Sequence, residues 1–182
     1  MFTLQSLKPN VSCVEAVDLF ASGGVAGFVR RLGIGPLQSV ADVYLPYRLY
    51  WVEILNGARP YTGWFALEAV SGLLDLYQFD HLPDAKELME LRTRNRLQPA
   101  LEEEVALRLL KDKLRRIVFR LGFFRVRNLE IRAEPVLSDL YIPYWVGFYG
   151  RGTSARLRVL DAVRRQFEGG KARALLASWL LN

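Results

Sequence analysis

The chain repeats one aromatic phrase, and this repetition constrains the fold more than any other feature of the sequence. Residues Asp42–Tyr47 read Asp-Val-Tyr-Leu-Pro-Tyr, and residues Asp139–Tyr144 read Asp-Leu-Tyr-Ile-Pro-Tyr. A second phrase, Leu-Glu-Ala-Val at Leu67–Val70, returns as Leu-Asp-Ala-Val at Leu160–Val163. The two phrases come in the same order each time, so the sequence predicts two similar halves.

The first half contains one helical pattern and three strand-like segments. A Ser-x-x-Glu capping box at Ser12–Glu15 opens an apolar-periodic run that reaches Leu32, with a kink expected at the two central glycines. Aromatic and β-branched residues predict strands, which we place at Asp42–Leu55, Tyr61–Val70 and Leu73–Phe79. An Asn-Gly turn at residues 56–57 indicates a hairpin between the first two. The first half therefore reads as a helix followed by a three-stranded antiparallel meander.

The second half repeats this pattern with additions. Its helix is expected at Pro99–Leu121, where proline and three glutamates occupy the first turns. An extra strand-like segment precedes the second meander, which is expected at Leu140–Tyr149, Ala155–Val163 and around Gln166. The further segments are an extra strand at Val126–Val136, a C-terminal helix at Lys171–Leu181 and a short connecting helix at Ala85–Arg96.

These elements predict an α+β fold of two similar halves, each a helix plus a three-stranded antiparallel meander, with a C-terminal helix. We expect residues 1–84 to form the first repeat, 85–98 a connector and 99–182 the second repeat. One helix cannot cover both faces of an aromatic sheet, so pairing two units would bury what each leaves exposed. The sheets can join edge to edge or pack face to face, and the sequence does not decide between the two.

A helix followed by an antiparallel meander, with the Leu-Glu-Ala-Val-Ser-Gly phrase at Leu67–Gly72 before a turn, resembles PepSY-like and cystatin-like α+β modules. The second copy, at Leu160–Arg165, lacks the Ser-Gly turn. The likeness is closest to an uncharacterised bacterial family with duplicated units of this kind. The resemblance implies the fold and hardly any function.

The repeated phrase supplies the candidate binding residues. Tyrosine hydroxyls and a guanidinium in one groove would suit a polar ligand, whereas the same tyrosines can instead fill the core and bond backbone groups. The candidates are Tyr44, Tyr47, Arg48, Tyr141, Tyr144 and Trp145.

Three functions stay open, and no catalytic signature is present. We prefer a non-catalytic binding or protein-interaction module, whose apolar surface meets a protein partner or a second copy of the chain. The second is nucleic-acid or anionic-surface binding, because residues 92–182 carry nineteen basic and nine acidic side chains. Its candidate arginines, beside Phe148 and Tyr149, are Arg125, Arg127, Arg132, Arg151, Arg156 and Arg158. The third is a small-molecule or enzymatic pocket between sheet and helix, with candidate acids Asp42, Glu68, Asp139 and Asp161.

Scarce cysteine and histidine limit the chemistry. Cys13 is the single cysteine and His81 the single histidine, so an intramolecular disulfide and a cysteine- or histidine-rich metal site are excluded. We expect no metal and no cofactor. No signal peptide and no run of eighteen apolar residues is visible, so a cytoplasmic protein without a membrane span is expected.

Overall fold

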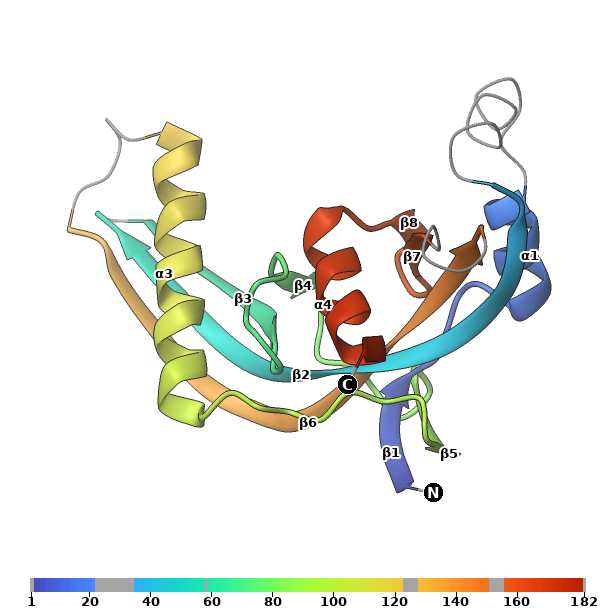
Figure 1. The fold of residues 1–182 in the computed structure, drawn as a ribbon. Helices are drawn as coiled ribbons and strands as arrows, with labels where there is room; N and C mark the ends of the chain where they lie inside the picture. The colour runs from blue at the N-terminus through green and yellow to red at the C-terminus, as the bar shows by residue number, and fades with distance from the viewer. Residues whose placement is uncertain (1, 22–34, 58, 123–127, 151–155, 182) are drawn as a thin grey trace. The chain divides into compact units, whose positions relative to one another are not determined.

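The structure is a computed structural model that describes residues 2–21, 35–57, 59–122, 128–150 and 156–181. Figure 1 shows the elements along the chain. In chain order they are β1 (Phe2–Leu7), α1 (Cys13–Ala21), β2 (Leu37–Asn56), β3 (Arg59–Glu68), β4 (Tyr77–Phe79), β5 (Leu88–Thr93), α3 (Glu103–Gly122), β6 (Glu130–Tyr149), β7 (Arg156–Asp161), β8 (Gln166–Phe167) and α4 (Gly170–Leu181).

The predicted fold class is wrong, because the strands of both halves belong to one large mixed sheet. Eight described strands form this sheet. Six of them follow the order β4-β3-β2-β6-β1-β5, and in addition β7 pairs with β6 and β8 pairs with β7. The strand β1 runs parallel to β6, whereas the β2–β3, β3–β4, β6–β7 and β7–β8 pairs are antiparallel. Each predicted third strand shrinks to two or three residues, so neither half forms a separate three-stranded meander.

Two compact units divide the chain, and each draws on both halves of the sequence. Unit 1 comprises residues 1–45, 89–97 and 141–182, and unit 2 comprises residues 46–88 and 98–140. The boundary cuts β2 and β6, which are 20 residues long each. The prediction that each half of the sequence folds as its own helix and meander therefore fails because β2 and β6 are so long. Each of these strands has residues in both units.

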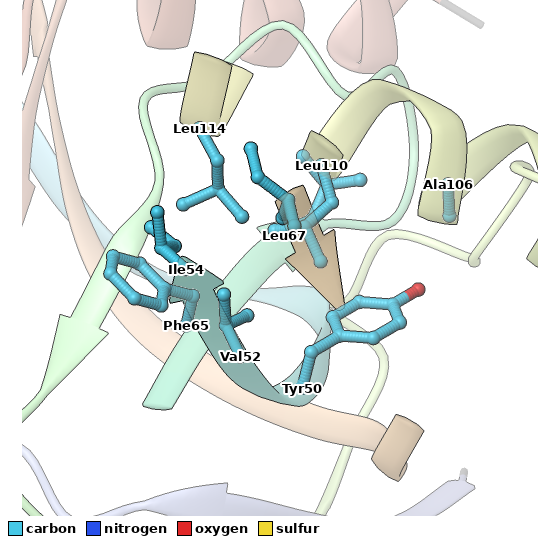
Figure 2. Close-up of a cluster of buried hydrophobic side chains, with 9 residues drawn as sticks. Tyr50, Val52, Ile54, Phe65, Leu67, Ala106, Leu110 and Leu114 are labelled. Carbon is cyan, nitrogen blue, oxygen red and sulfur yellow. The ribbon is translucent and has the colours of Figure 1, made fainter. Parts of the chain in front are cut away.

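In unit 2 the helix α3 packs on strands from the first half of the sequence. Its Ala106, Leu110 and Leu114 recur every fourth residue and form one buried face. They pack against Tyr50 on β2 and Leu67 on β3, as Figure 2 shows. The helix begins with Glu103 and Glu104 and has Arg120 in its last turn, an arrangement that suits the helix dipole.

In unit 1 the helix α1 packs on strands from the second half. Its Ala16 and Phe20 are buried with Tyr149 on β6 and Leu160 on β7. Of the apolar residues in the periodic run that opens at Ser12–Glu15, Phe20 is buried as expected, whereas Val14 is 72% and Val17 39% exposed. The predicted continuation of the helix and its kink, residues 22–32, lie outside the described residues.

One local prediction is wrong, one strand was not predicted, and two predictions are confirmed. The predicted helix at residues 85–96 is the strand β5, whose Glu90 and Arg92 are exposed while Thr93 is buried. The strand β1 was not expected from the sequence. The hairpin at Asn56-Gly57 is confirmed by the β2–β3 register, and the C-terminal helix is confirmed by α4. Within the described ranges, no helix is long and apolar enough to span a membrane.

Candidate functional site

The two Leu-acid-Ala-Val phrases build the same turn, one in each unit. The buried Glu68 carboxylate accepts hydrogen bonds from the backbone N–H groups of Val70 and Ser71, and from the Ser71 hydroxyl at 2.7 Å. The buried Asp161 carboxylate accepts the N–H groups of Val163 and Arg164, both at 2.8 Å. These two candidate acids therefore hold backbone in place.

The alanine of each phrase ties the strands to the segment ahead of a helix. In unit 2, the Ala69 N–H donates to the Pro46 carbonyl, and the Ala69 carbonyl accepts from Leu101, two residues before α3. In unit 1, the Ala162 N–H donates to the Pro143 carbonyl, and the Ala162 carbonyl accepts from Val11, two residues before α1. Both prolines thus lie inside continuous strands and serve as acceptors.

The six candidate binding residues are divided between the units. Tyr44 and Tyr141 share a small buried cluster with Leu4 in unit 1. Tyr47 is buried in unit 2, where its ring meets that of Tyr77 edge-on at 5.9 Å. Tyr144 is buried in unit 1 opposite Asp161 in the β6–β7 register.

The remaining two candidates hold matching positions. The Arg48 Nη2 atom donates to the Leu101 carbonyl at 2.6 Å, and the Trp145 indole N–H donates to the Val11 carbonyl at 2.9 Å. Both carbonyls belong to residues two positions before a helix, and both side chains are half-buried. Each side chain thus fastens a strand to the start of a helix.

Around Tyr44 and Tyr141 the structure adds two polar residues that the sequence analysis did not single out as site residues. The Asn95 amide donates to the Asp42 carboxylate at 3.1 Å, and Arg96 donates to the Tyr141 hydroxyl at 3.0 Å. Burial, and then the Asp42 carboxylate, raise the pKa of Tyr44 to about 12. Tyr44 is therefore a neutral hydroxyl at physiological pH.

The candidate arginines for an anionic partner do not form one group. Arg125, Arg127 and Arg151 lie outside the described residues. Arg132 is in unit 2 and is paired with Glu130 at 2.9 Å and Glu53 at 3.5 Å. Of the candidate aromatics, Tyr149 is buried and donates its hydroxyl to the Phe20 carbonyl, and Phe148 is half-buried.

Arg156 and Arg158 lie on β7, where the structure supplies an aromatic neighbour that the sequence analysis missed. The Arg158 guanidinium carbon lies 3.8 Å from the centre of the Phe167 ring, and that ring is 40% exposed. Lys171 and Arg173 are exposed on α4, which contacts β7. We call these five residues from β7, β8 and α4 the basic face of unit 1.

The two units differ strongly in charge. Unit 1 carries 13 basic and six acidic residues, net +7, whereas unit 2 carries 12 basic and 13 acidic residues, net −1. One of the six acids of unit 1, Asp161, is buried in its turn. The positive charge of the chain is thus a property of unit 1 and does not simply follow its second half.

In comparisons with known proteins, no family model, no curated protein and no solved structure matches the chain. The likeness to PepSY-like modules stays a prediction. In the described ranges, no group of three or more histidine, cysteine, aspartate or glutamate side chains is placed to hold a metal ion.

Proposed function

We propose that the chain is a non-catalytic binding protein whose unit 1 binds single-stranded nucleic acid. The observation that carries this proposal is the concentration of net charge, +7 in unit 1 against −1 in unit 2. When basic side chains neutralise phosphates, the counterions condensed on the nucleic acid are released into solution, and this release favours binding. The basic face of unit 1 is the proposed contact.

Stacking favours a single strand over a duplex as the partner. The Arg158 guanidinium carbon lies 3.8 Å from the centre of the Phe167 ring, so a guanidinium and a partly exposed aromatic ring stand together on this face. Unpaired bases stack on arginine planes and aromatic rings, whereas the bases of a duplex are already stacked on one another. Arg156 on the same strand, with Lys171 and Arg173 on the helix α4 that contacts β7, adds exposed positive charge for the phosphates.

Filter retention of labelled single-stranded DNA and RNA across a salt series tests the proposal. We expect retention at low salt that falls steeply as salt rises, with weaker retention of a duplex of the same length. Retention that does not respond to salt, or none at all, removes the proposal.

A second candidate function, self-association, is favoured by the outer side of α1. Val14 is 72% and Val17 39% exposed, one helical turn apart, while Ala16 and Phe20 of the same helix face the core. Two copies of the chain can cover such a face in a symmetric dimer. Sedimentation of the wild type and of Val14→Lys over a range of concentrations tests it, and a wild type that stays monomeric contradicts it.

A further inference from the structure

The strand β5 (Leu88–Thr93) is an edge strand of the sheet. It stands last in the strand order, where β1 is its one neighbour among the described strands (Figure 1). Apart from that pairing, no backbone hydrogen bond of these six residues to another described residue is found. An edge of this kind offers a row of backbone N–H and C=O groups to a further extended strand.

The side chains of β5 alternate between a charged outer face and an apolar inner face. Glu90 and Arg92 are exposed, whereas Leu91 packs against the cluster that contains Tyr44 and Tyr141. Because side chains two positions apart leave the same face of a strand, the acid and the base stand next to each other on the outer face. The edge therefore carries one charge of each sign.

This pattern is complementary to itself when two copies of β5 run antiparallel. In a symmetric pair centred on Leu91, the Glu90 of each copy lies opposite the partner's Arg92, so two attractive pairs form across the strands. A symmetric register centred on Glu90, or one centred on Arg92, places like charges directly opposite each other, which is destabilising. A slip by one residue turns the charged face of one copy towards the apolar face of the other. The charges thus favour one register.

We infer that β5 is an interface at which two copies of the chain pair edge to edge, antiparallel and centred on Leu91. The partner is a second copy because charges on an edge strand deter unrelated strands, whereas here they match those of an identical strand. The contact is six residues long on each side, so the association is weak. It uses neither the basic face of unit 1 nor the outer side of α1, the other surface considered for self-association.

Sedimentation velocity of the full chain over a range of concentrations, at constant salt, tests the inference. Glu90→Arg places two arginines opposite each other, and Arg92→Glu places two glutamates opposite each other. Each variant is expected to self-associate on the order of tenfold to hundredfold more weakly, because two attractive pairs become repulsive. Glu134→Arg and Arg116→Glu make the same charge changes at exposed positions of unit 2, and we expect both to associate as the wild type does.

The decisive measurement mixes Glu90→Arg and Arg92→Glu in equal amounts. Every arginine of one variant then lies opposite a glutamate of the other, so a one-to-one complex of about wild-type affinity is expected. Such a complex also shows that both variants fold.

Val14→Lys separates this interface from α1, because the association that remains in this variant is the part assigned to β5. None remaining would overturn the inference in favour of α1. Single variants that associate as the wild type does, or a mixture that stays monomeric, would also overturn it. A wild type that is monomeric throughout would overturn it too and leave the edge to an extended segment of a different protein.

Discussion

Gly147 on β6 lies against the ring of Phe20 on α1. A Cβ atom added to Gly147 would come within 2.8 Å of the Phe20 Cδ1 atom. The Phe20 ring is also held edge-on by Tyr149 and by Phe167, at centroid distances of 6.5 Å and 5.5 Å. This contact joins a helix from the first half of the sequence to a strand from the second.

Gly147→Ala tests that contact. The ring has little room to move, so we expect the overpacked core to lower the free energy of unfolding by about 1–3 kcal/mol. The measurement is urea denaturation followed by tryptophan fluorescence. Gly169→Ala is the matched control, because nothing lies within 4 Å of a Cβ there. Equal stability of the two variants would contradict this account of how α1 packs.

Glu68→Ala tests the structural role given to the acid of the repeated phrase. The change leaves the N–H groups of Val70 and Ser71 without their acceptor in a part-buried turn. We expect a loss of about 3 kcal/mol in the free energy of unfolding. Glu90→Ala removes an exposed glutamate of β5 and is expected to change stability by less than about 0.5 kcal/mol. If both variants lose equally little, the carboxylate does not hold the turn.

Alkaline unfolding tests the environment of Tyr44. Its pKa is raised to about 12 in the folded protein, so the folded state holds this proton more tightly than the unfolded state does. The resulting stability is present below the unfolded pKa of about 10 and is lost as the pH rises towards 12. We expect Tyr44→Phe to reduce the fall in unfolding free energy over this range by about 1–2 kcal/mol. A pH dependence identical to that of the wild type would contradict the buried, Asp42-facing hydroxyl.

Local chemistry made part of this fold predictable. The Asn-Gly turn, the acid-started helix α3 and the strands around both Tyr-x-Pro-Tyr phrases are encoded within short windows of the sequence. The partners of the helices are not, because an apolar face such as that of Ala106 and Leu110 shows that a helix packs, but not on which strand. The segment Leu88–Thr93 is a strand, although a helix is predicted there from its leucine, methionine, glutamate and arginine residues, which favour helices. Its alternation of apolar and charged residues indicates a strand, but it covers too few residues to outweigh that composition.

The candidate site was predictable to a similar degree. Arg48 could be named from its place beside the repeated phrase, but its hydrogen bond to the Leu101 carbonyl could not, because the two residues are 53 positions apart in the sequence. Phe167 was missed because its importance comes from its contact with Arg158, which lies on the neighbouring strand.

The most direct test of the central claim compares two triple variants in a salt series. One variant replaces Arg156, Arg158 and Arg173 in unit 1 with glutamine, and the other replaces Arg115, Arg116 and Arg120, all exposed on α3 of unit 2. Both lose the same charge, so net charge alone affects them equally. The measurement is the slope of log affinity for a single-stranded oligonucleotide against log salt concentration. The account predicts a slope shallower by about 2 for the unit 1 variant and a nearly wild-type slope for the unit 2 variant. Equal slopes for the two variants would contradict it.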